Sequence, residues 1–467
     1  MTNVTYITPN PKGYTVSVGV IRIIEAVNNG AADGTGIHKI LNLAKGIIGP
    51  NLPLPIVQYC VGIQNNLLGG YPSHWEIIPS SIFVVIFAIL FIVHLFIFIV
   101  NFTRGHFFTL SLGWSFAALL RLSSFALRIS WAQDINRVLI GIANEILFVL
   151  PTVFLVSFNL VLAQRLFTWR HPVGGSRKLF WGFMMGLYIF VFGIVALTIV
   201  ASATPYLAFL SSHMYLSYKK CVMATAILVI VYALTAVALI GLSFWLPTSK
   251  DENLYTYQPW WIESFHPFYF VPKGAAREAE QTFMKRNHNH RHAIRVIAAT
   301  HHHYKMVEGL SNERGDLKHN ISLLVIIIST ILLFLSNVIR CVIVFQSRYN
   351  YYASPLAQPA VMYLVWGGFE LIMHLGYILG RADLRFYRPD ILPEVVRSIV
   401  TAEQSGMISE AESEANSEDY YAQQYGINSF EDEEISHTSL ERINVPPRYS
   451  YPSEISQKRD DESEFYF

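Results

Sequence analysis

The chain has 467 residues, of which 52% are hydrophobic and only 14% are charged, and its formal net charge at pH 7 is +1. An ordinary soluble domain carries about 25% charged residues, so this balance argues against a soluble protein and for a membrane protein. The small net charge offers no basic excess for nucleic acid, and three scattered cysteines exclude a disulfide framework or a CxxC zinc module.

The first 78 residues contain apolar pieces that are too short to cross a bilayer. Val16–Val27 and Ile37–Ile48 are about half the length of a spanning helix, which needs roughly 20 residues. We expect an extracytoplasmic N-terminal region, residues 1–78, with short amphipathic helices at the membrane surface. A loosely packed soluble segment is the alternative. Asn3, in Asn3-Val4-Thr5, is a candidate glycosylation site.

Seven later stretches are apolar and long enough to span a bilayer as helices. They cover residues 79–101, 108–130, 138–163, 178–202, 221–245, 320–345 and 360–380. The sequence therefore predicts an all-α, polytopic fold, a seven-helix transmembrane bundle over residues 79–382, whose first partner is the lipid bilayer. We expect a multi-pass protein of the plasma membrane, with the endosome or vacuole membrane as alternatives.

The connections between the spans predict the orientation. Lys and Arg gather in the first, third and fifth connections, above all in the long fifth one, residues 247–319, and such residues accumulate on the cytoplasmic side. We therefore predict that the N-terminus lies outside and that the C-terminus lies in the cytoplasm.

The fifth connection also carries six histidines, His288, His290, His292, His301, His302 and His303. Imidazoles at such spacing can bind zinc, copper or nickel, or respond to pH near 6.5. No cysteine or fixed spacing defines a coordination shell, so a solvated basic loop that contacts anionic lipid is the competing interpretation.

Three charged side chains fall inside the second and third spans. Arg121, Arg128 and Glu145 would each cost at least ~2.5–3.5 kcal/mol if left alone there. Glu145 lies at a depth between the two arginines, so it can pair with either if the second and third helices adjoin. Such a group is either a site for a lipid headgroup or anion, or a structural pair that fixes the helix register.

The first, sixth and seventh spans contribute four more polar side chains. Glu370 and His374 are one helical turn apart, His94 lies at a similar depth, and Arg340 can reach toward Glu370 or toward the interface. The cluster can relay protons, accept a ligand, or form a satisfied hydrogen-bonded network.

The segment after the last span changes character twice. Residues 383–399 are basic and apolar, which suits a juxtamembrane segment along the inner leaflet, and residues 400–467 are rich in acidic residues and Ser, which predicts a disordered tail. Within the tail, Pro446, Pro447 and Tyr449 form a PPxY ligand for WW domains, as in ubiquitin ligases. Lys458 is a candidate for ubiquitination, and Ser409, Ser429 and Thr438 are candidate phosphorylation sites.

Two stretches resemble a fungal family of multi-spanning membrane proteins that is catalogued as a domain of unknown function. The first stretch, residues 127–172, carries Arg128, Trp131, Asn136, Asn159, Leu160, Gln164, Arg165, His171 and Pro172, and the second carries Glu370, Arg381, Asp383, Arg385, Phe386 and Pro389. Pro151 and the long N-terminal region depart from the family. The resemblance implies a fungal source and the same bundle over most of residues 79–390, but no chemistry. A fainter likeness is to fungal lipid-translocating exporters.

Several function classes are disfavoured by what the sequence lacks. The seventh span has no Lys for a retinal Schiff base, the third ends in Ala163-Gln164-Arg165 rather than Asp-Arg-Tyr, and no phosphate loop, HExxH or GxSxG motif occurs. We therefore expect no enzyme and no cofactor. The leading hypothesis is a receptor-like or sensor-like protein whose loop and tail contact cytoplasmic partners. The alternatives are a translocator of lipids or small amphiphiles and an adaptor that recruits a WW-domain ubiquitin ligase.

Overall fold

The computed structural model describes residues 16–170, 177–246, 256–259, 262, 264–274, 294–297 and 319–387. The chain divides into two units, Met1–Leu392 and Pro393–Phe467, and all described residues belong to the first. The glycosylation candidate Asn3, the six-histidine cluster and every candidate site in the tail lie outside the described residues.

Seven helical segments are long and apolar enough to cross a bilayer, so the predicted all-α bundle of seven spans is confirmed. The spans are α4 (Ile77–Thr103), α5 (Leu110–Gln133), α6 (Val138–Arg170), α7 (Arg177–Leu207), α8 (Ser212–Trp245), α10 (His319–Gln346) and a composite seventh helix of α11 (Pro359–Met362), η7 (Tyr363–Phe369) and α12 (Glu370–Leu379). The middle part of this seventh helix, η7, is π-helical.

The remaining elements are short. Before the bundle come α1 (Val16–Val27), α2 (Ile37–Ile48), α3 (Leu54–Gly62) and the 3₁₀ turn η1 (His74–Glu76). The 3₁₀ turns η5 (Asn350–Tyr352) and η6 (Pro355–Ala357) connect the sixth and seventh spans, and α13 (Ala382–Arg385) follows the last span. Strands β1 (Thr256–Pro259) and β2 (Ile294–Ile297) pair antiparallel within the fifth connection, a small ribbon that the apolar pattern did not predict.

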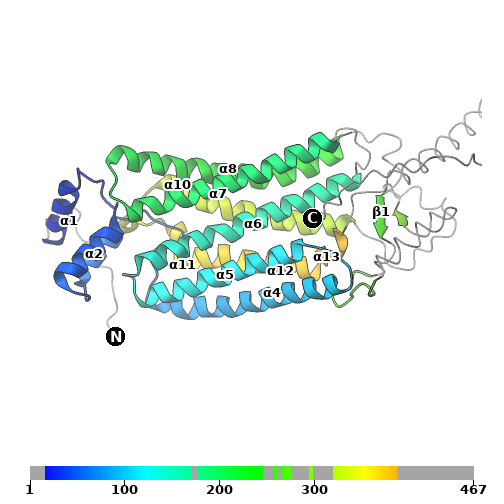
Figure 1. The fold of residues 1–467 in the computed structure, drawn as a ribbon, viewed down its shortest axis with the longest axis horizontal. Coiled ribbons are helices and arrows are strands. Elements are labelled where there is room, and N and C mark those ends of the chain that lie inside the picture. Colours follow the sequence, from blue (N-terminus) through cyan, green and yellow to red (C-terminus); the bar gives the residue numbers. More distant parts are fainter. Residues whose placement is uncertain are drawn as a thin grey trace, which may run out of the picture. The chain divides into compact units, whose positions relative to one another are not determined.

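The spans run side by side, with α5 between α4 and α6, while α6 also contacts α8 and α10 (Figure 1). Many large apolar side chains of α4 are exposed at spacings of three or four residues, among them Ile82, Val85, Ile89 and Ile92. In water such a surface would promote association, whereas in a bilayer it is the surface that lipid covers.

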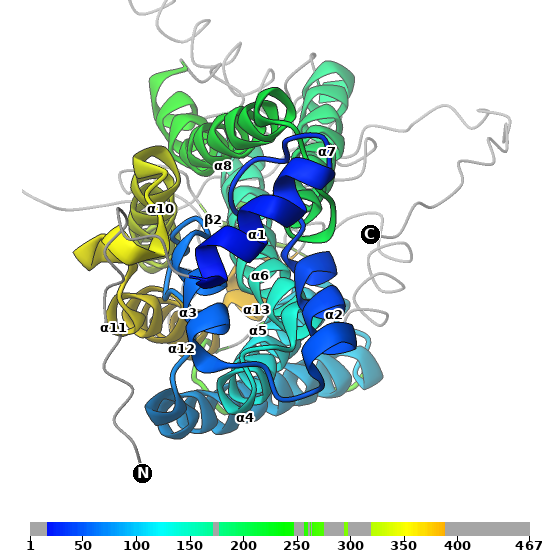
Figure 2. The same cartoon turned by 90° about the vertical axis from the view of Figure 1, so that its left-hand side faces the viewer.

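Residues 16–76 cover one end of the bundle, which we call the cap end, and α13 lies at the opposite end, which we call the loop end (Figures 1 and 2). Backbone hydrogen bonds fasten this cap: Asn66 N donates to Arg348 O at 2.8 Å, and Asn350 N donates to Gln64 O at 2.8 Å. The cap is therefore an integral part of the helical fold.

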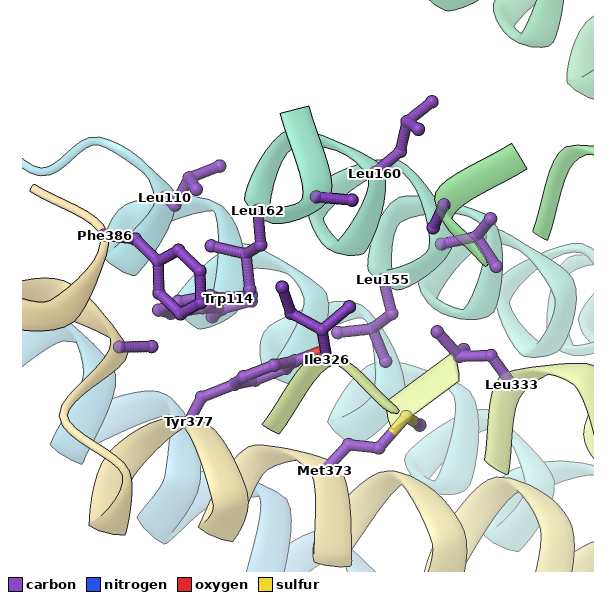
Figure 3. Packing of buried hydrophobic residues seen from close by; sticks show 14 of the residues in the cluster. Leu110, Trp114, Leu155, Leu160, Leu162, Ile326, Leu333, Met373, Tyr377 and Phe386 are labelled. Atoms are coloured by element: carbon purple, nitrogen blue, oxygen red, sulfur yellow. The ribbon is translucent and has the colours of Figure 1, made fainter. Parts of the chain in front are cut away.

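A large apolar cluster fills the bundle between α5, α6, α10 and α12 (Figure 3). At its centre the rings of Trp114 and Tyr377 stack, with 4.5 Å between their centroids and 8° between their planes. This packing holds α5 against α12, which sets the polar groups of these two helices opposite one another.

Candidate functional site

Arg121 of α5 and Glu370 of α12 form a buried ion pair in the middle of the bundle. Arg121 Nε donates to Glu370 Oε2 at 2.7 Å, and Nη2 contacts Oε1. Nη1 donates to Phe148 O at 2.9 Å and Nη2 also donates to Thr152 Oγ1 at 3.0 Å, while the Thr152 hydroxyl donates to Glu370 Oε1 at 2.8 Å. Both charged side chains are at most 1% exposed. Each charge is thus matched, and the pair fixes α5, α6 and α12 in register.

A second buried pair joins the cap to the bundle. Arg128 Nη2 donates to Glu76 Oε2 at 2.8 Å and to Gly69 O at 2.7 Å, while Nη1 donates to Gly70 O at 2.9 Å. Gly69 and Gly70 have φ of +86° and +56°, a backbone conformation that favours glycine, and a Cβ on Gly69 would lie 2.4 Å from Met362 Sδ. The two glycines aim their carbonyls at the guanidinium.

His94 of α4 and His374 of α12 come together as their depths predicted. His94 Nε2 and His374 Nδ1 are 3.0 Å apart and both rings are buried, so one nitrogen donates to the other according to the tautomer. Nε2 of His374 and Nε1 of the neighbouring Trp114 are buried and make no hydrogen bond to the described residues. The two histidines form a sealed contact within the apolar cluster.

A third arginine cluster lies at the loop end. Arg381 donates to both carboxylate oxygens of Asp383, at 2.9 and 2.7 Å, and its Nη1 donates to the backbone carbonyls of His266 and Pro267 at 3.2 and 3.0 Å. Burial raises the pKa of Asp383, but the hydrogen bonds and charge of Arg381 outweigh it, so the pKa lies below its ordinary value. The cluster holds residues 264–274 against the ends of α4 and α12.

The cap end contains a cavity of about 150 Å³ between α6, α7, α8 and α10, closed by residues 64–68. Its wall is mainly apolar, but three charged side chains line it: Glu145 of α6, Lys219 of α8 and Arg340 of α10. Among the described residues none of the three takes part in an ion pair. Glu145 Oε1 is buried without a hydrogen-bond partner in the described part of the chain.

The three charged residues lie at similar depth along their helices. Glu145 comes seven residues after the start of α6 at 138, Lys219 seven after the start of α8 at 212, and Arg340 six before the end of α10 at 346. At 1.5 Å per residue these steps are about 9–11 Å. The deeper wall is apolar and includes Val153 and Val229. The cavity therefore has a polar layer near the cap and an apolar floor.

These partners differ from the pairings that the spans alone suggested. Arg121 and Arg128 each bind a glutamate, but neither binds Glu145: the partners are Glu370 and Glu76. Glu76, the partner of Arg128, belongs to η1, before the first span, so the depths of the spans could not predict this pair. Because Glu370 pairs with Arg121, it does not pair with Arg340, which lines the cavity instead.

Sequence reasoning missed Lys219 and Arg381 as site residues. The apolar stretch begins at 221, but the helix begins two turns earlier at Ser212, because the hydroxyl of Ser211 caps it by accepting from Met214 N. Lys219 thereby becomes part of a spanning helix. Arg381 was noticed only within the Arg-x-Asp-x-Arg pattern of the resemblance.

Comparison with known proteins adds one finding. Residues 172–387 match the family model described as "Protein of unknown function (DUF3112)". The match contains Lys219, Arg340, Glu370 and Arg381, whereas Glu145 precedes it, as does nearly all of the first resembling stretch, residues 127–172. It is shorter than the expected range of 79–390. Neither the curated proteins nor the solved structures contained a match.

A metal centre finds no support in the part of the chain that the structure describes, where no three His, Cys, Asp or Glu side chains are grouped to hold an ion. The six-histidine cluster falls outside that part and stays a prediction. The cap-end cavity is thus the candidate functional site.

Proposed function

We propose that this membrane protein is receptor-like or sensor-like and that it binds a small molecule in the cap-end cavity. The observation that carries the proposal is the set of charged side chains in this cavity, Glu145, Lys219 and Arg340, which are left out of the ion pairs found elsewhere in the bundle. A mainly apolar pocket with a few convergent polar groups is typical of small-molecule sites.

The cavity adjoins a structural feature that can transmit its occupancy. Trp366, in the π-helical η7, lines the cavity and stacks on Phe148 with 4.8 Å between the ring centroids. The guanidinium of Arg121 lies 5.5 Å from the centroids of both rings. A ligand that contacts Trp366 therefore acts one residue layer from the Arg121–Glu370 pair. Short π-helical segments occur frequently at functional sites, which favours η7 as the element that shifts.

The predicted orientation completes the proposal. With the N-terminus outside, the cap-end cavity lies in the extracytoplasmic half of the bundle, and the loop end, with the fifth connection and the tail, faces cytoplasmic partners. Epitope tags in residues 1–15 and in the tail, probed in intact and permeabilised cells, test this arrangement. A tail that is accessible in intact cells would contradict it.

The ligand-binding step is tested by filling the cavity. Val229 of α8 lines it and is 4% exposed, whereas Val231, two residues later, is 53% exposed on the lipid-facing side. Small aromatic and six-carbon acids, alcohols and amines are screened for ligands that raise the unfolding temperature of the protein in nanodiscs. We expect the Val229→Phe variant to lose the response and the matched Val231→Phe control to keep it, since a ligand stabilises only a protein that binds it. Equal responses in the two variants would refute the cavity as the site.

A translocator is separated from a sensor by flux. The two arginines that a polar path would use, Arg121 and Arg128, are both enclosed in ion pairs, and four hydrogen bonds already engage each guanidinium, which disfavours them as contacts for a moving solute. We expect that protein in sealed liposomes binds a ligand found in the screen without moving it across the membrane. Protein-dependent uptake that the Val229→Phe variant abolishes would establish transport instead.

A further inference from the structure

The charge inside the cavity is unbalanced. Lys219 and Arg340 carry two positive charges against the one negative charge of Glu145, so the ionised cavity holds a net charge of +1. Charge in a low-dielectric surrounding is strongly unfavourable unless a counter-charge lies beside it. A bound anion would supply this counter-charge.

Hydrogen-bond donors face the same space. Tyr215 lines the cavity, and because its oxygen accepts from Asn65 Nδ2 at 2.8 Å, its own hydroxyl hydrogen is free to point elsewhere. The ammonium of Lys219 lies 4.6 Å from the centroid of the Tyr215 ring, which keeps these two donors together. By contrast, the unpartnered acceptors Glu145 Oε1, Asn65 Oδ1 and Asn66 Oδ1 are buried, with almost no accessible surface. The accessible polar layer is rich in donors, which suits a carboxylate.

The size and chemistry of the floor limit the rest of the ligand. Beyond the polar layer the wall is formed by Val149, Val153, Val195 and Val229, with Trp366 at the side. Cavities of about 150 Å³ with apolar walls accept a benzene ring. The whole cavity, polar layer included, therefore has room for a ligand built on one ring or on a chain of similar size.

Glu145 sets an upper limit on the ligand's charge. Its carboxylate lies in the same layer as the two cations, so it repels a second negative charge and favours a monoanion over a dianion. Glu145 also provides a test of the ligand's charge. Removing the glutamate charge should strengthen the binding of an anionic ligand and weaken the binding of a cationic one.

We infer that the cavity binds a small organic monoanion, with a carboxylate group between Lys219 and Arg340 and an apolar body of about six to eight carbon atoms on the valine floor. This ligand class rests on the proposed function, since it specifies what the same cavity binds.

Three probes of nearly equal shape test the charge preference: benzoate, benzyl alcohol and benzylamine. Their dissociation constants are measured by titration calorimetry at pH 7 on the full chain in phosphatidylcholine nanodiscs, with empty nanodiscs as the blank. We expect benzoate to bind roughly tenfold more tightly than benzyl alcohol, because its carboxylate makes one additional contact with a positive charge. Benzylamine, which carries a positive charge, should bind most weakly.

Charge variants identify the residues responsible. Lys219→Gln is expected to weaken benzoate binding about tenfold and to leave benzyl alcohol unchanged. Lys220→Gln is the matched control, because Lys220 is the next residue, is exposed, and does not line the cavity. Glu145→Gln is expected to strengthen benzoate binding, since it removes a repelling charge.

The outcomes separate the two proposals. If benzylamine binds best and Glu145→Gln weakens it, the anion inference is overturned while ligand binding in the cavity stands. If benzoate binds but Lys219→Gln and Lys220→Gln behave alike, the inference is likewise overturned. If no probe binds and the wider screen also finds no ligand that depends on Val229, the proposed function falls as well.

Discussion

Replacing Arg121 by Gln leaves the carboxylate of Glu370 buried without its counter-charge. Removing one partner of a buried ion pair costs about 3–5 kcal/mol, because the remaining charge cannot reach water. Arg121 is 0% exposed and also donates to Phe148 O and Thr152 Oγ1, so Gln can replace only part of its bonding. We expect a loss near the lower end of this range, about 3 kcal/mol, since Thr152 still donates to Glu370.

The assay is unfolding of the purified protein in mixed micelles by titration with sodium dodecyl sulfate, followed by helix content. Arg137→Gln is the matched control, because Arg137 pairs with Asp134 at 3.4 Å on the surface, where the two side chains are 48% and 40% exposed. Such pairs contribute about 0–1 kcal/mol. Equal losses for Arg121→Gln and Arg137→Gln would refute the claim that the inner pair is sealed from water.

A double substitution sharpens the same test. Changing both Arg121 and Glu370 to Leu removes both charges, and replacing a buried pair by apolar residues is often neutral or stabilising. The double variant should therefore be more stable than Arg121→Gln. A double variant less stable than the single one would show that the pair contributes net stability beyond balancing its own charges.

Three further predictions concern the ends of the bundle. The Arg381→Lys substitution keeps the charge but loses the bidentate contact with Asp383, so it should release residues 264–274. Limited proteolysis within this segment should then be faster than in the wild type, whereas the control variant Lys220→Gln should be cleaved at the wild-type rate. Burial raises the pKa of Glu25 in the cap to about 8, so between roughly pH 4.5 and 8 the folded state holds a proton that the unfolded state releases. The stability of the cap, measured by hydrogen exchange, should therefore fall as the pH rises over that range. The Glu25→Gln variant should show a weaker dependence on pH. Gly69→Ala, at φ +86° and against Met362, should lower the free energy of unfolding by at least ~1 kcal/mol in the sodium dodecyl sulfate titration. In the same titration Gly46→Ala, inside α2 with no atom within 4 Å of the added Cβ, should be neutral or stabilising.

The seven spans were predictable because their signal is local. An apolar run of about 20 residues needs no knowledge of its neighbours. The largest extension beyond a predicted span is at the start of α8, where polar residues such as Lys219 continue the helix outside its apolar part. The helices α1 and α2 likewise coincide with apolar pieces visible in the sequence.

The partners of the buried charges were not predictable by the same means. Depth along a helix showed that His94 and His374 share a level, and the structure joins them at 3.0 Å. Depth gives no information on which helices adjoin or which faces meet, however. Glu370 follows the π-helical η7, whose extra residue per turn rotates its face relative to a regular helix, and Glu76 belongs to no span.

The contrast between enclosed and unpaired charges is the reason for placing function at the cap end. Arg121, Arg128 and Arg381 each bind a carboxylate from another part of the fold or from the adjoining turn, and each also donates to backbone or hydroxyl oxygens, so these donors are already engaged. Arg340 and Lys219 differ, because they lie in spanning helices at the wall of a cavity and take part in no ion pair among the described residues. Placing an unpaired cation in a spanning helix costs free energy of insertion into the bilayer. For Arg121 and Arg128, the bound carboxylate offsets this cost within the fold. A ligand that supplies the missing negative charge would offset the cost at this site, which makes the cavity more stable when occupied than when empty.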